Sequence, residues 1–98
     1  MPQFIAAVRR DLERFSDSDF TPELLEEEAQ RARQLYAEGI FRQVWSRGDH
    51  LGAVILIEAG TPDEAQAVLA SLPLAVREML SLDLLAPVMP YRGFGPRG

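Results

Sequence analysis

The middle of the chain, residues 38–59, holds the side chains best suited to chemistry. Arg42, Trp45 and the only histidine, His50, follow one another there. A guanidinium can clamp a carboxylate through two hydrogen bonds, an indole ring can wall an apolar pocket, and a neutral imidazole can accept a proton. These side-chain types therefore suit proton transfer on a small carboxylated molecule.

Each of these residues also has a structural explanation that the sequence leaves open. Arg42 lies among aliphatic residues, where it could form an ion pair between subunits or with a helix instead of holding a substrate. Trp45 could pack in the core, and His50, which follows a turn, could lie at the surface. Arg47, between them, is a second candidate to hold a carboxylate or a developing enolate.

The flanking residues predict that a β-hairpin supports these side chains. Residues 40–47 and 51–58 are apolar runs on either side of Gly48 and Asp49, a dipeptide suited to a two-residue turn. Neither face of this hairpin is polar. We therefore expect one face to lie against the chain's own helices and the other against a second subunit.

A two-residue turn fixes the register and hence the faces of the hairpin. Arg47 then lies opposite His50 and Trp45 opposite Gly52, while Arg42 points to the other face. One site that uses Arg42, Trp45 and His50 would therefore need a bulge, strand twist or a second subunit. The face of Trp45 is expected to carry Phe41, Gln43, Trp45 and Arg47 from the first strand and His50, Gly52, Val54 and Leu56 from the second.

Glu58 closes the second strand of the predicted hairpin. At the rise of a strand it lies roughly 26 Å from His50, so the two side chains could meet only across subunits. Glu58 also has the simpler reading of marking the end of the strand.

Two helices and two outer strands complete the expected domain. Residues 21–39 and 61–72 both begin with Thr-Pro and carry apolar residues three or four apart, which predicts amphipathic helices. Residues 3–10 and 82–90 predict the first and last strands, and the two prolines of the latter restrict it to an edge or a short length. The order strand, helix, strand, strand, helix, strand is the ferredoxin-like plan of an α+β fold.

The first predicted helix opens with an acidic run, Glu26, Glu27 and Glu28. Three carboxylates could bind a cation. A solvated face near the positive end of the helix dipole explains the run more simply, and we expect that role.

Length and composition set limits on the fold and its partners. The 98 residues predict one domain, residues 1–98, with a loop tail at residues 91–98. Because 47% of the residues are hydrophobic and few elements can bury them, a homo-oligomer is expected. A net charge of -5 argues against nucleic acid as a partner.

Missing residue types exclude further kinds of chemistry. The chain has no cysteine and no lysine, and its single histidine cannot supply a multi-histidine metal site. We therefore expect neither a bound metal nor a cofactor. The first residues resemble neither a signal peptide nor a membrane span, so a cytoplasmic protein is expected.

The run AEGIFRQVWSRGDH, followed by TPDEAQAVLASLPL, resembles the muconolactone delta-isomerase family. The resemblance implies small α+β subunits that pair sheet to sheet as a dimeric α+β barrel and can assemble into decamers. It also implies proton transfer without a cofactor that moves a double bond in a carboxylated unsaturated lactone. Arg42, Trp45 and His50 match the family pattern, and Glu58 stands where the family also has an acid.

Three departures from that pattern make the expected pocket more apolar. Gln43 replaces a histidine, Ala53 replaces an asparagine, and the strand FIAAV lacks the family's histidine and lysine. We expect an isomerase or related lyase for an unsaturated lactone or polyketide-like carbonyl compound, with His50 moving the proton and Arg42 or Arg47 holding the negative charge. The alternatives are a non-catalytic dimer that binds a small molecule or scaffolds another protein, in which Arg42 would pair with a protein carboxylate, and, by fold analogy alone, a cofactor-free oxygenase.

Overall fold

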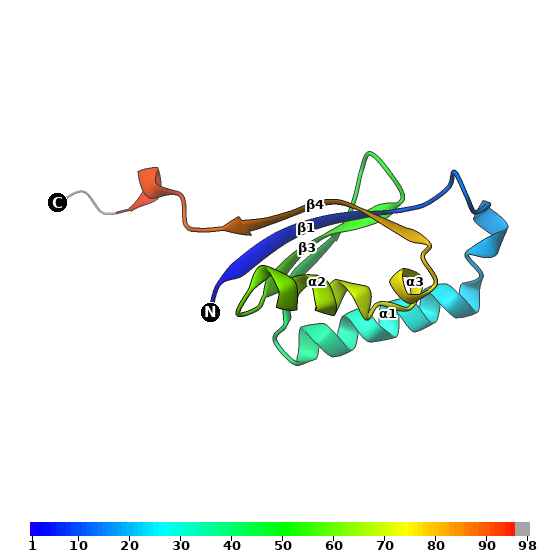
Figure 1. Cartoon of the computed structure of the whole chain (residues 1–98), viewed down its shortest axis with the longest axis horizontal. Coiled ribbons are helices and arrows are strands. Elements are labelled where there is room, and N and C mark those ends of the chain that lie inside the picture. The colour runs from blue at the N-terminus through cyan, green and yellow to red at the C-terminus, as the bar shows by residue number, and fades with distance from the viewer. Residues whose placement is uncertain (96–98) are drawn as a thin grey trace.

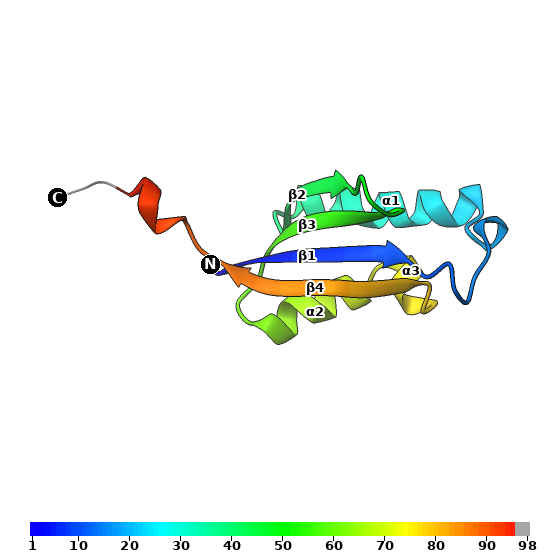
Figure 2. The same cartoon turned by 90° about the horizontal axis from the view of Figure 1, so that it is seen from above.

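The computed structural model describes residues 1–95 and contains a four-stranded antiparallel sheet with helices on one face (Figure 1). The strands lie in the order β2-β3-β1-β4, as Figure 2 shows. This is the ferredoxin-like order that the sequence predicts. The elements are β1 (Gln3–Arg10), α1 (Pro22–Ala37), β2 (Phe41–Ser46), β3 (Gly52–Glu58), α2 (Pro62–Ala70), α3 (Pro73–Val76) and β4 (Leu80–Val88), with 3-10 turns at Asp17–Asp19 and Arg92–Phe94.

The two longer helices begin as predicted. Thr21 Oγ1 accepts the N–H of Leu24, and Thr61 Oγ1 accepts the N–H of Glu64. Each threonine is followed by a proline that needs no hydrogen-bond acceptor at the first helical position. The second helix ends earlier than expected, at Ala70, because the chain turns and starts the short α3.

The predicted edge position of the last strand is confirmed, since β4 pairs only with β1. The tail that follows extends away from the body (Figure 1). It contains the turn Arg92–Phe94, whereas the expectation was a loop, and residues 96–98 of the expected loop lie outside the described residues.

The core lies between the sheet and the helices. Alternate residues of β1 face the helices and are buried, as the period of a strand requires. They pack with residues of β3, α1 and α2 in one cluster. The cluster includes Phe4, Ala6, Val8, Leu35, Ile55, Ile57, Ala65 and Leu69.

The other face of the sheet is apolar and carries no helix (Figure 1). One row of paired residues crosses it from edge to edge: Trp45, Val54, Ala7 and Leu84. The two outer members, Trp45 and Leu84, are 48% and 47% exposed. We call this surface the open face.

The hairpin between β2 and β3 differs from the prediction. Its register places Trp45 opposite Val54 instead of Gly52, and the N–H of Arg47 donates to the carbonyl of Gly52. Residues 48–51 therefore form a four-residue loop, and the two-residue turn was wrong. The carbonyl of Leu51 accepts the N–H of Arg10 on β1, which draws the end of the loop away from β2.

Arg42 stands at a bulge in β2. Phe41 pairs with Ile57 and Gln43 with Leu56, so Arg42 is the extra residue between them. The bulge turns Phe41 toward the helices, where it is 1% exposed. The expectation that Phe41 shares a face with Trp45 was therefore wrong.

Gly52 allows β1 and β3 to approach each other closely. A Cβ at this position would overlap the carbonyl oxygen of Val8 and lie 2.7 Å from the Cα of Arg9. Because both are backbone atoms, we expect Gly52→Ala to lower the free energy of unfolding by about 1–3 kcal/mol, measured by urea denaturation. Gly48→Ala is the control, since its Cβ would meet no atom within 4 Å; equal midpoints for the two variants would contradict the prediction.

Candidate functional site

A small cavity between the helices and the sheet is lined by one acidic and one basic side chain among mainly apolar residues. Its volume is about 150 Å³, and a second cavity of about 150 Å³ shares Val8 and Leu80 with it. Together they approach the lower end of the range for small-molecule pockets, about 300 Å³. The first cavity, which we call the Glu28 cavity, is lined by Val8, Arg10, Glu28, Gly52, Ala53, Leu74 and Leu80.

Glu28 is the acidic group of this cavity. Burial raises the pKa of its carboxyl group, while the N–H of Leu74, which donates to Oε1 at 3.0 Å, and the charge of Arg10 oppose that shift. The carboxyl group therefore keeps its proton to a higher pH than an exposed glutamate does. A carboxyl group with a raised pKa in a cavity is a candidate acid or base.

The sequence analysis missed Glu28 because it belongs to an acidic run. The expected solvated role holds for Glu26, which is exposed and pairs with Arg33, but it is wrong for Glu28. A signal was present, since Glu28 follows the buried Leu24 by four residues and precedes the buried Leu35 by seven. That spacing places all three on the apolar side of α1.

Arg10 supplies the positive charge of the cavity. Its guanidinium lies over the ring of Phe20, 5.1 Å from the centroid, and its backbone N–H binds the hairpin loop at Leu51. Stacking on an aromatic ring holds a guanidinium without neutralising its charge. Arg10 can therefore stabilise negative charge in the cavity.

Arg47 is bound by two carboxylates at the same end of the sheet. Its guanidinium contacts Asp49 at 2.7 Å and Asp83 at 2.6 Å, and Asp83 also pairs with Arg9 at 3.1 Å. These hydrogen bonds raise the pKa of Arg47 and lower the pKa values of Asp49 and Asp83. Because its side chain is only 11% exposed and already neutralised, Arg47 is poorly placed to hold a substrate carboxylate.

His50 lies in the hairpin loop and is half exposed. Its Nε2 is 3.8 Å from Oδ2 of Asp49, the carboxylate that also binds Arg47. The structure thus brings His50 and Arg47 together through Asp49, although the register that placed them directly opposite each other was wrong. Trp45 lies further along β2, on the open face.

The remaining predicted residues lie at the opposite end of the hairpin. Arg42 is exposed and lines a cleft of about 310 Å³ at the end of α1, while Glu58 accepts a hydrogen bond from Gln3. At the rise of a strand, Arg42 is roughly 16 Å along the chain from Arg47. Within one chain, Arg42 and Glu58 therefore do not share a site with His50.

Residues 1–95 contain neither a cluster of metal-binding side chains nor a helix suited to a membrane. No group of three or more histidine, cysteine, aspartate or glutamate residues in that range could hold a metal ion. Over the same range, every helix is too short or too polar to cross a membrane.

The family model described as muconolactone delta-isomerase matches residues 3–86. This range contains the Glu28 cavity and all the predicted site residues. A comparison with curated proteins finds no match.

The pairing of Asp83 predicts a stability effect that depends on pH. Its arginine partners lower the pKa of Asp83 below the ordinary value of 3.8, so the stabilisation is complete above that value and is lost as the pH falls through the lower pKa of the folded state. Asp83→Asn should therefore lower the melting temperature at neutral pH, and the difference from the unaltered protein should shrink in acid.

Thermal melts between about pH 7 and pH 2 measure that difference. Glu13→Gln is the control, because the exposed Glu13 side chain forms no ion pair within residues 1–95. If the difference in melting temperature between Asp83→Asn and the unaltered protein stays constant down to the lowest pH, the ion pairs of Asp83 do not stabilise the fold.

Proposed function

Because the chain belongs to the muconolactone delta-isomerase family, we propose that it is a cofactor-independent isomerase or related lyase. It moves a proton and a double bond in an unsaturated lactone or a polyketide-like carbonyl compound. The observation that carries this proposal is Glu28, a partly buried carboxylate with a raised pKa beside Arg10 in an apolar cavity. Such a base works best when its pKa approaches the working pH.

In this proposal Glu28 both removes and returns the proton. Its carboxylate takes a proton from the carbon next to the substrate carbonyl, and the electrons of that C–H bond pass into the conjugated system as a dienolate. Arg10 stabilises the negative charge on oxygen. Neutral Glu28 then donates the proton to the far carbon of the dienolate, so the double bond moves with no net oxidation.

The hydrogen bond from Leu74 orients the base. It engages Oε1 of Glu28, which leaves Oε2 to receive the proton. The apolar walls of the cavity limit hydration of the carboxylate, and this makes it a stronger base than an exposed glutamate.

His50, the general base expected from the sequence, is the alternative proton carrier. It precedes Leu51, whose carbonyl binds the N–H of Arg10, so its loop borders the same end of the sheet. If His50 carries the proton, Trp45 would form a wall of a site on the open face, because it does not line the Glu28 cavity. Arg42 and Glu58 would take part only across subunits.

We also propose that the active form is a homodimer in which two open faces pack together, and that it acts in the cytoplasm. The row from Trp45 to Leu84 supplies an apolar surface of the kind that obligate dimers bury. Assembly beyond the dimer, into a decamer, is compatible with this arrangement. The alternative of a non-catalytic scaffold gains no support from Arg42, which forms no ion pair within residues 1–95.

Replacement of Glu28 tests the catalytic proposal. With muconolactone in D2O, mass spectrometry follows deuterium uptake and ultraviolet absorbance follows isomerisation. Glu28→Gln keeps the acceptor for Leu74 but removes the base, so kcat/KM should fall by about 100- to 10,000-fold. In the unaltered protein kcat/KM should fall as the pH is lowered and Glu28 becomes protonated. The midpoint of this fall should lie above 4.5, the ordinary pKa of glutamate.

Two further variants show whether a loss of activity in Glu28→Gln is specific to Glu28. Glu27→Gln, on the exposed side of α1, should keep full activity. His50→Ala should lose less than about tenfold if Glu28 is the base. The reverse pattern, a large loss for His50→Ala with Glu28→Gln active, would assign the proton transfer to His50 instead.

Replacement of Leu84 tests the dimer. An arginine at the β4 end of the apolar row would leave a charge without a partner in a face-to-face contact. Leu84→Arg should therefore sediment as a monomer with an unchanged circular dichroism spectrum. Leu12→Arg, at an exposed leucine outside the sheet, should remain a dimer; a dimeric Leu84→Arg protein would place the interface elsewhere.

A further inference from the structure

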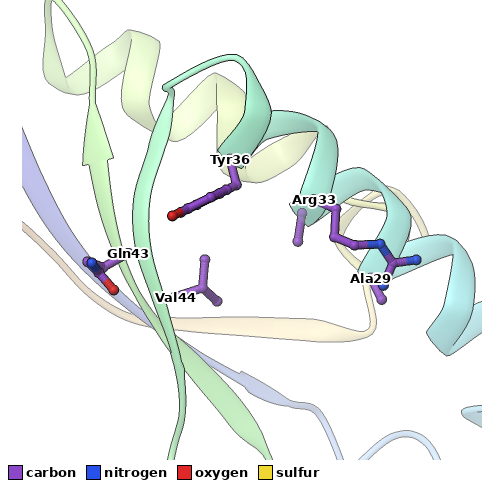
Figure 3. Close-up of a pocket in the computed structure, with 6 residues that line it drawn as sticks. Ala29, Arg33, Tyr36, Gln43 and Val44 are labelled. Atoms are coloured by element: carbon purple, nitrogen blue, oxygen red, sulfur yellow. The ribbon is translucent and has the colours of Figure 1, made fainter.

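A groove separates α1 from the edge strand β2 (Figure 3). It shares no lining residue with the Glu28 cavity. Its volume is about 620 Å³. In Figure 3, Tyr36 extends from α1 toward β2 and Val44 stands beside it. The groove is lined by Ala29, Ala32, Arg33, Tyr36, Gln43 and Val44.

Small side chains on α1 create this groove. Ala29 and Ala32 are too short to fill the space in front of β2. As a result Val44 is 42% exposed although it faces the same side of the sheet as the buried Ile55, and Tyr36 is 60% exposed. The result is a mainly apolar surface open to solvent.

The groove borders the cleft at Arg42. The two hollows share Tyr36, and the cleft is otherwise lined by Ala37, Gly39, Phe41 and Arg42. The bulge in β2 brings the Arg42 guanidinium against the end of α1, where Nη1 lies 3.7 Å from the place of a Cβ on Gly39. A positive charge thus stands at one end of an apolar groove.

That charge is available for a ligand. Arg33, the other arginine of the groove, is neutralised by Glu26 at 2.6 Å. Arg42 makes no ion pair or side-chain hydrogen bond within residues 1–95.

Arg42 is also not needed to cap α1. The carbonyls of Gln34, Leu35 and Tyr36 already accept backbone N–H groups of Glu38, Ile40 and Gly39. The guanidinium therefore has no structural partner at the helix end that would hold it there.

We propose that the Arg42 cleft and the α1–β2 groove form one binding site for a small amphipathic monocarboxylate. The carboxylate pairs with the fork of Arg42, and a flat apolar body lies against Tyr36, Ala32 and Val44. One free guanidinium matches one carboxylate. None of these residues lines the Glu28 cavity, so the site is separate from the proposed catalytic one.

Titration of the full chain with 2-naphthoate, followed by nitrogen-15 NMR, tests this site. Amide signals of α1 around Ala32 and Tyr36 and of β2 around Val44 should shift. The uncharged analogue 2-naphthalenemethanol should bind at least about tenfold more weakly than 2-naphthoate, because it cannot form the ion pair with Arg42. Shifts confined to Gly52 and Leu74 would instead place the ligand in the Glu28 cavity and overturn the proposal.

Three variants complete the test. Arg42→Gln should abolish the preference for naphthoate over the alcohol, whereas the control Arg33→Gln should retain it. Ala32→Trp should fill the groove and prevent both ligands from binding. A preference that survives Arg42→Gln would overturn the proposal.

The naphthoate titration also tests whether a second copy of the chain occupies the groove instead. The exposed aromatic residues Tyr91 and Phe94 of a second copy could fill the groove. If naphthoate binds only after both are changed to serine, the groove is a protein contact and the proposal is wrong. The muconolactone assay of Glu28→Gln is unaffected by any of these outcomes, so the two proposals fail separately.

Discussion

The hairpin end of the sheet depends on Arg47, which crosses the open face. Arg47 follows β2 at one edge, and its partner Asp83 lies on β4 at the other, with β3 and β1 between them. Its guanidinium also approaches the carbonyl of Val8 on β1. Gly52 has no side chain to block that path, and Asp49 closes the ion pair from the loop. One side chain therefore holds both edges of the sheet and the loop of His50 in place.

The surroundings of each charged group decide whether it can act on a ligand. Arg47 is held by two carboxylates and is a structural cation, whereas Arg10 stacks on Phe20 and keeps a charge that can face the cavity. Arg42 is carried by a bulge to the end of α1. Glu28 is set apart from its acidic neighbours because its carboxyl group is turned toward apolar walls. Residue type alone does not separate these roles.

The sequence predicts the fold better than the site, for a physical reason. Strand and helix periodicities are local, so the element order and the Thr-Pro helix starts could be predicted. The loop length could not, because it depends on contacts of the loop with β1 and on the pairing of Arg47 with Asp49. A bulge leaves no local signal either, which is why the face of Phe41 was predicted wrongly. Glu28 required attention to its spacing from Leu24 and Leu35 within a run that otherwise suggests solvent.

Two of the departures from the isomerase pattern concern residues that line the Glu28 cavity. Ala53, where the resemblance implies asparagine, and Val8, from the strand that lacks the family's histidine and lysine, both line it. Fewer polar groups on the walls leave the Glu28 carboxylate less well solvated, which raises its pKa and strengthens it as a base. The same change removes hydrogen-bond partners for a polar substrate. The cavity therefore offers a ligand apolar walls and one cationic side chain, that of Arg10, so shape and a single charge contact are its means of recognition.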